Sequence, residues 1–108
     1  MSMIFTVLSA KLAEITGKPE ISCRGVIRYA VRDTAKHLQY TTDYKVWQDY
    51  LQGMNFRDWD ALLQGPAFFE HLTKIGEKTP GEVVAQMRRT LVEKQALFTM
   101  SVAPGRSL

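Results

Sequence analysis

Apolar residues recur every three or four positions along most of this chain, which is the spacing that places them on one face of an α-helix. The first such segment ends at Gly17, with Pro19 shortly after it, and this combination is typical of a helix C-terminus. Its apolar face consists of Ile4, Phe5, Leu8, Leu12 and Ile15. We therefore expect an amphipathic helix at the start of the chain.

Four further helices are expected along the chain, because the same spacing returns between successive glycines and prolines. The first runs from the threonine pair at 41–42, which can cap it, to Gly53. Asn55 can cap the second, and Pro66 lies in the first turn of the third, where its missing N–H breaks no hydrogen bond. The fourth begins at Thr79-Pro80-Gly81-Glu82, which has the pattern of a capping box.

The segment from about Ile21 to Tyr40 fits two structures. Its apolar and polar residues alternate at first, as in a β-strand, but the alternation fails at Gly25, Val26 and Ala30. Its length and a second apolar set at helical spacing favour a helix. That set consists of Cys23, Ile27, Ala30, Val31, Thr34 and Leu38. We adopt the helix, and the strand stays the open alternative.

Together these elements predict an all-α fold, a compact bundle of five to six short helices. A chain of 108 residues is one domain by size and can bury a core without disulfides. We assign residues 1–100 to a single helical domain. Residues 101–108, which include Pro104 and Gly105, are predicted to form a flexible C-terminal tail.

Basic residues follow one another at four-residue spacing along the second helix, at Arg24, Arg28, Arg32 and Lys36. On an ideal helix each step of four residues turns the side chain by about 40°, so the row winds slowly while it covers one side. The apolar set of the same segment lies behind this row. We therefore predict a basic edge that faces outward and contacts a partner. The alternative is a solvated helix face, neutralised by Asp33 and neighbouring acids.

Composition and charge limit the classes of partner. Fourteen basic and eleven acidic residues give a formal charge of +3, which permits contact with nucleic acid or acidic proteins but requires neither. The one cysteine, Cys23, cannot form an internal disulfide, so nothing indicates an oxidising compartment. The apolar N-terminal residues follow no basic segment, and no run approaches the roughly 20 apolar residues of a membrane span. We expect a soluble, cytoplasmic protein with no membrane contact.

The sequence offers little for catalysis or metal binding. Asp33 and His37 would meet on a helix, where the pair could orient a general base or simply support the helix. Cys23 falls on the predicted apolar face, where a thiol is buried and inert. One cysteine and two widely separated histidines do not make a structural zinc site. We expect no enzymatic activity, no catalytic residue, no metal and no cofactor.

One stretch carries a family resemblance. Gly53-Met54-Asn55-Phe56-Arg57-Asp58-Trp59-Asp60-Ala61-Leu62 resembles the Gly-aromatic-Arg-Asp-Trp-x-x-Leu segment of small helical domains in glyoxalase-related and plasmid-borne bacterial proteins. Ala35-Lys36-x-Leu38 has a counterpart in those domains too. The resemblance covers roughly residues 33–63, and Met54-Asn55 is an insertion relative to the family segment. The resemblance implies a bacterial origin, either chromosomal or on a mobile element. It implies no functional site, because those domains have no settled activity.

We predict a non-catalytic bacterial accessory or regulatory module that docks on a protein partner through a basic and aromatic surface. Tyr, Trp and Arg dominate interface hot spots, and aromatic residues are concentrated between residues 40 and 59. The predicted binding residues are Arg24, Arg28, Arg32, Lys36, Tyr44 and Tyr50. The alternative function is a nucleic-acid-binding regulator that uses the basic helix edge. A third hypothesis is an enzyme centred on His37, and the oligomeric state stays open.

Overall fold

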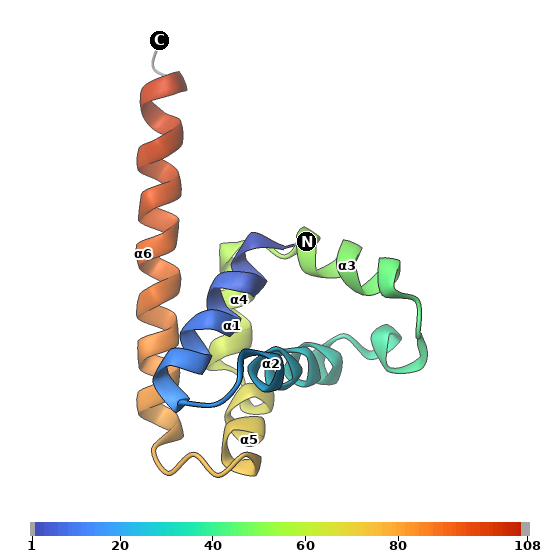
Figure 1. Ribbon diagram of the computed structural model, residues 1–108. Helices are drawn as coiled ribbons and strands as arrows, with labels where there is room; N and C mark the ends of the chain where they lie inside the picture. Colours follow the sequence, from blue (N-terminus) through green and yellow to red (C-terminus); the bar gives the residue numbers. More distant parts are fainter. Residues whose placement is uncertain (1, 107–108) are drawn as a thin grey trace.

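The computed structural model in Figure 1 describes residues 2–106, with side chains described for residues 2–97. Residues 2–106 form six α-helices and one 3₁₀-helix and contain no strand, so the predicted all-α fold is confirmed for this part of the chain. The elements are α1 (Met3–Thr16), α2 (Glu20–Thr34), the 3₁₀-helix η1 (Lys36–Tyr40), α3 (Tyr44–Gly53), α4 (Phe56–Gln64), α5 (Pro66–Lys74) and α6 (Pro80–Arg106).

The helices pack around α2 and around the first half of α6. α2 lies between α1 and α5, while α6 contacts α1, α4 and α5. Figure 1 shows α6 extending well past the other helices, so that only its N-terminal half lies beside them. The turn that carries η1 connects α3 to the end of α2. α3 adds Leu51 to the core, and Trp47 and Tyr50 pack against it. The fold is therefore a helical body from which the second half of α6 projects.

One continuous core joins the helices. At its centre Trp59 of α4 is fully buried, and its ring stacks on Phe5 of α1 with the ring centroids 6.3 Å apart. The other fully buried large side chains come from five helices and from η1, and they include Leu8, Leu12, Ile27, Val31, Leu38, Leu63, Phe68, Leu72 and Met87. Because almost every element contributes to the same core, the orientation of each helix is fixed by its apolar face.

Two helix boundaries lie at residues that typically end or cap a helix, Gly17 and Asn55. Gly17 ends α1 in the left-handed region at φ 73°, and its N–H donates to the Ala13 carbonyl at 2.9 Å. This conformation favours glycine because a Cβ would be strained there. At the start of α4 the Asn55 side chain accepts from the Asp58 N–H, and the Asp58 carboxylate accepts from the Asn55 N–H. The prediction that Asn55 caps this helix is confirmed.

The segment from Ile21 to Tyr40 differs from its prediction in where the helix ends. It is helical, as expected, but the α-helix stops at Thr34 rather than continuing to Tyr40. Ala35 adopts φ −109° and ψ 85°, and residues 36–40 form the separate 3₁₀-helix η1. The Thr34 hydroxyl donates to the Val31 carbonyl at 2.9 Å, and such a side-chain bond to the preceding turn competes with continuation of a helix. η1 then turns Leu38 into the core, where only 1% of it is exposed.

The last helix is longer than the short helices that were expected. α6 contains 27 residues, since no glycine or proline occurs between Gly81 and Pro104 to end it. The tail predicted for residues 101–108 overlaps the last turns of this helix, whose backbone is helical to Arg106. Residues 107–108 lie outside the described residues. The flexibility of that segment stays a prediction.

We expect Trp59→Ala to lower the free energy of unfolding by ~3–5 kcal/mol, because it leaves a large cavity at the centre of the core. Tyr40→Ala is the control, since the Tyr40 side chain is 88% exposed and its truncation should change stability by no more than about 0.5 kcal/mol. Urea unfolding followed by circular dichroism measures both. Equal effects of the two substitutions would contradict the central position of Trp59.

An ion pair connects α4 to α6 at the surface. Arg88 donates to both carboxylate oxygens of Asp60, through Nε at 2.9 Å and through Nη2 at 3.3 Å. These hydrogen bonds and the positive charge of Arg88 lower the pKa of the Asp60 carboxyl from its ordinary value of 3.8. The pair is half-exposed, so its contribution to stability is small.

We expect Asp60→Asn to destabilise the protein slightly at neutral pH and to have no effect in strong acid. Because the pKa of Asp60 is lower in the folded state, its stabilisation is fully present above the unfolded value of 3.8 and is lost as the pH falls through the folded value. Urea unfolding of both proteins across this pH range measures the difference. A difference that persisted after full protonation would show that Asp60 acts through packing instead of charge.

Candidate binding groove between α2 and α3

The predicted basic row is shorter than expected. Arg24, Arg28 and Arg32 lie on α2, and none of them is among its buried residues, but Lys36 does not continue the row. The helix ends before Lys36, and the ψ angle of 85° at Ala35 turns the chain away from the helix axis. Lys36 therefore lies on η1, and the expectation of a four-residue edge on one helix is wrong for this position.

Arg24 is also less available to bind a partner than Arg28 and Arg32 are. Its Nη2 donates to a Glu20 carboxylate oxygen at 3.1 Å, one helical turn earlier. Its Nε atom is buried. The Glu20 carboxylate partly neutralises this guanidinium, so Arg24 contributes less positive potential to the surface than Arg28 and Arg32.

Arg28 and Arg32 contact aromatic rings in place of acids. The Arg28 guanidinium carbon lies 5.6 Å from the ring centroid of Phe5, and that of Arg32 lies 4.7 Å from the centroid of Tyr29. Within residues 2–97, no carboxylate forms an ion pair with either arginine. A guanidinium held over a ring keeps the N–H groups at its edge available, so both side chains can still bind an anion.

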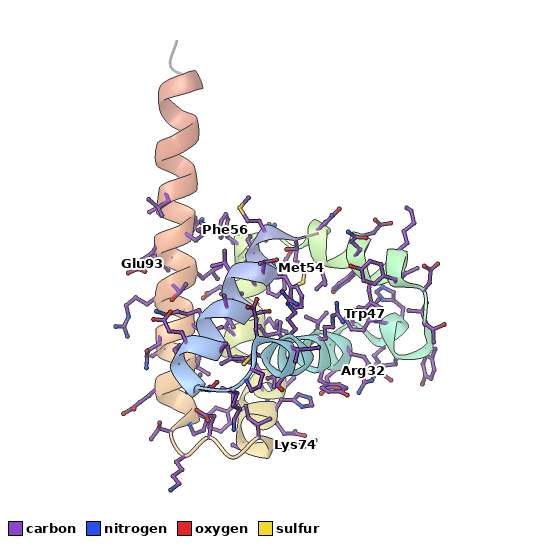
Figure 2. The ribbon with its side chains drawn as sticks, in the orientation of Figure 1. Arg32, Trp47, Met54, Phe56, Lys74 and Glu93 are labelled. Carbon is purple, nitrogen blue, oxygen red and sulfur yellow. The ribbon has the colours of Figure 1, made fainter. Side chains whose placement is uncertain are left out.

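These two arginines form one wall of a groove between α2 and α3. Its volume is about 350 Å³, and it is lined by Gly25, Arg28, Tyr29, Arg32, Thr42, Tyr44 and Trp47. Figure 2 labels a residue from each wall, with Trp47 on the α3 side and Arg32 on the α2 side. Tyr29 and Tyr44 are about half-exposed. The groove thus combines two cationic groups with three aromatic rings.

Tyr44 and Tyr50, the two aromatic residues predicted to bind, lie on different sides of α3. Tyr44 belongs to the groove, but Tyr50 faces away from it and meets His37 edge-on, with the ring centroids 5.3 Å apart. Tyr50 instead lines a second open cavity of about 480 Å³, together with Asp49 and Asp58. The structure therefore brings together Arg28, Arg32 and Tyr44 of the predicted set, and leaves Arg24, Lys36 and Tyr50 outside the groove.

Two aromatic residues of the groove were not predicted to bind. Trp47 follows Tyr44 by three residues on the same helix. The helical spacing therefore predicts that the two side chains are neighbours. Tyr29 lies between Arg28 and Arg32 in position along α2, but no sequence pattern indicates its contacts. Its ring stacks on His71 of α5, with the ring centroids 5.6 Å apart.

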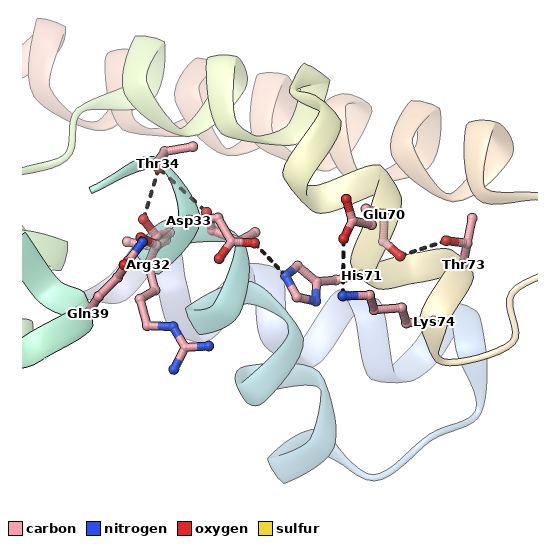
Figure 3. Close-up of polar contacts among 10 residues, drawn as sticks. Arg32, Asp33, Thr34, Gln39, Glu70, His71, Thr73 and Lys74 are labelled. Carbon is pink, nitrogen blue, oxygen red and sulfur yellow. Dashed lines mark hydrogen bonds and ion pairs between the residues drawn. The ribbon is translucent and has the colours of Figure 1, made fainter. Parts of the chain in front are cut away.

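His71 also forms a hydrogen bond with Asp33, as Figure 3 shows. The His71 Nε2 atom and an Asp33 carboxylate oxygen lie 2.8 Å apart, in a hydrogen bond that joins α5 to the end of α2. The predicted pair of Asp33 with His37 does not form, because the helix ends between these two residues. The arrangement that would make His37 an oriented general base is therefore missing, and the bond between Asp33 and His71 holds the ring on which Tyr29 stacks.

Cys23 lies in the core. Its side chain is fully buried, and burial raises the pKa of its thiol above the ordinary value of 9.0. The Thr16 hydroxyl lies 3.8 Å from its sulfur atom and only partly offsets this effect. A buried thiol with a raised pKa is a poor nucleophile.

In the described part of the chain, no group of three or more His, Cys, Asp or Glu side chains is placed to hold a metal ion. No helix among the same residues is long and apolar enough to cross a membrane.

Comparison of the chain with protein-family models, with curated proteins and with solved structures finds no match.

We expect Arg28→Ala to lower the free energy of unfolding by ~1 kcal/mol, because it removes a cation–π contact and the packing of the side-chain stem beside Phe5. Lys36→Ala is the matched control, since Lys36 is exposed and should change stability by no more than about 0.5 kcal/mol. Thermal and urea unfolding measure both. If the two substitutions had the same effect, Arg28 would not be anchored on α1.

Proposed function

We propose that this chain is a non-catalytic accessory or regulatory module that docks on a protein partner through the groove between α2 and α3. The observation that carries this proposal is a pair of arginines, Arg28 and Arg32, beside the rings of Tyr29, Tyr44 and Trp47. Among the side chains that the structure describes, no carboxylate pairs with either arginine. Arg, Tyr and Trp are the residue types that contribute most to interface hot spots. Their concentration in one groove supports a protein-docking function.

The α2–α3 groove also resembles a ligand pocket in its size. Its volume of about 350 Å³ falls at the small end of the range of roughly 300–1,000 Å³ found for such pockets. A groove of this size holds one or two side chains of a partner. The resemblance of residues 33–63 to small helical domains supports a bacterial source for the module.

Nucleic-acid binding is the alternative. Aromatic rings beside arginines can stack bases and contact phosphates, which favours this function in part. A strand of nucleic acid, however, requires a basic surface that follows its backbone over several phosphates. Here Arg24 is paired with Glu20 and Lys36 lies off the helix, so the row supplies two unpaired arginines. The short row favours a protein partner over a nucleic acid.

We expect Arg28→Glu combined with Arg32→Glu to reduce capture of partner proteins from a nuclease-treated bacterial lysate at least tenfold, because the change places negative charge on the groove wall. Arg57→Glu combined with Arg89→Glu is the control, since these exposed arginines lie on α4 and α6 and make the same change in net charge. Quantitative mass spectrometry of the captured proteins measures the effect. The control should capture the same proteins as the unmodified chain.

Two results would contradict the protein-docking proposal. Equal loss of capture in the groove variant and in the control would mean that only net charge matters. Binding of random-sequence DNA or RNA at about 50 mM salt that falls steeply at about 200 mM, and that the groove variant loses, would assign the groove to nucleic acid.

A further inference from the structure

We infer that the groove between α2 and α3 binds an extended acidic segment that has two carboxylates two residues apart and an aromatic side chain beside them. This inference rests on the proposed function, and it names the chemistry of the partner.

The spacing of Arg28 and Arg32 matches an extended segment. Four residues of α-helix rise by about 6 Å, which separates the Cα atoms of Arg28 and Arg32 along α2. In an extended chain, two residues span about 6.6 Å, and both side chains point to the same side. Carboxylates at positions i and i+2 of a partner can therefore each meet one guanidinium. Because each guanidinium rests against a ring, its N–H edge is oriented in advance for a bidentate contact with a carboxylate.

The acids of α2 and the acid that caps α3 already have partners. Asp33 is bound to His71, and Glu20 is bound to Arg24. Asp43 caps the start of α3 by accepting from the Lys45 N–H at 2.9 Å. Since these carboxylates are held elsewhere, an incoming carboxylate does not have to displace them from Arg28 or Arg32.

The opposite wall favours an aromatic side chain. Tyr44 and Trp47 of α3 face Tyr29 and the arginines across the groove, and the Tyr44 side chain is 57% exposed. Tyr44 and Trp47 lie on the Arg28 side, since both also line a small inner cavity with Arg28 and Phe5. An aromatic ring of the partner would offset-stack on these rings while its neighbouring carboxylates reach Arg28 and Arg32.

Labelled peptides test this inference by fluorescence polarisation. The reference peptides contain Glu-Gly-Glu-Gly-Phe and its reverse, so that either chain direction is covered. The comparison peptides replace both Glu by Gln, place the two Glu next to each other, or replace Phe by Ser. We expect the better reference peptide to bind, and each of the three changes to weaken binding by roughly tenfold or more, because one charge-assisted hydrogen bond or one stacked ring is worth about that factor.

Variants of the protein locate the binding site. Arg28→Gln with Arg32→Gln, and Tyr44→Ala alone, should each weaken binding of the reference peptide at least tenfold, whereas Arg57→Gln with Arg89→Gln should leave it unchanged. Tyr44→Ala keeps the test valid if loss of Arg28 impairs folding, since Tyr44 is largely exposed. Circular dichroism confirms that each variant is folded.

Several outcomes would overturn the inference. Equal affinity for the Glu and Gln peptides, unchanged affinity in both groove variants, or no binding of either reference peptide would each exclude an acidic segment. Tighter binding of oligothymidylate than of the peptides would assign the groove to nucleic acid. If the peptides fail while the charge-reversed groove variant still loses its captured proteins, the docking function stands and only the chemistry of the partner is wrong.

Discussion

The burial of one face of α2 is the constraint on which the rest of the molecule depends. Ile27, Ala30 and Val31 are fully buried where α1 and α5 pack against the helix, so rotation of α2 would expose them. Their burial keeps the guanidinium groups of α2 off the face that packs on α1 and α5. The hydrophobic core therefore determines where the positive charge lies, although the core itself contains none of the groove residues.

The end of α2 is the second determinant of the groove. If the helix continued past Ala35, η1 and the turn after it could not bring α3 back across α2. The break removes Lys36 from the basic row, and it also provides the opposite wall with Tyr44 and Trp47. α3 itself is held by few buried residues, since among its side chains only Leu51 is buried, while Trp47 and Tyr50 are partly buried against the core. Because few buried side chains hold α3, this wall of the groove can adjust to a ligand. This property suits a docking surface.

Much of the fold could be predicted from local patterns, and the contacts between distant segments could not. Gly17 and Asn55 mark helix boundaries because their conformations and side chains act on the nearest turn of backbone. The bond between Asp33 and His71 joins residues 38 positions apart, so no spacing rule identifies it. The position of Tyr50 outside the groove could not be predicted for a related reason. The helical repeat places residues on faces, but the sequence does not say which side of α3 a neighbour would occupy.

The most direct test of the docking groove uses the two tryptophans as probes in a ¹H–¹⁵N spectrum of the protein titrated with its captured partner. Trp47 lies in the groove, whereas Trp59 is fully buried in the core. The indole N–H signal of Trp47 should shift or broaden together with the side-chain signals of Arg28 and Arg32, while the signal of Trp59 stays in place. An unchanged Trp47 signal, with shifts gathered around Arg57 instead, would place the docking surface on the α4 side and contradict the account.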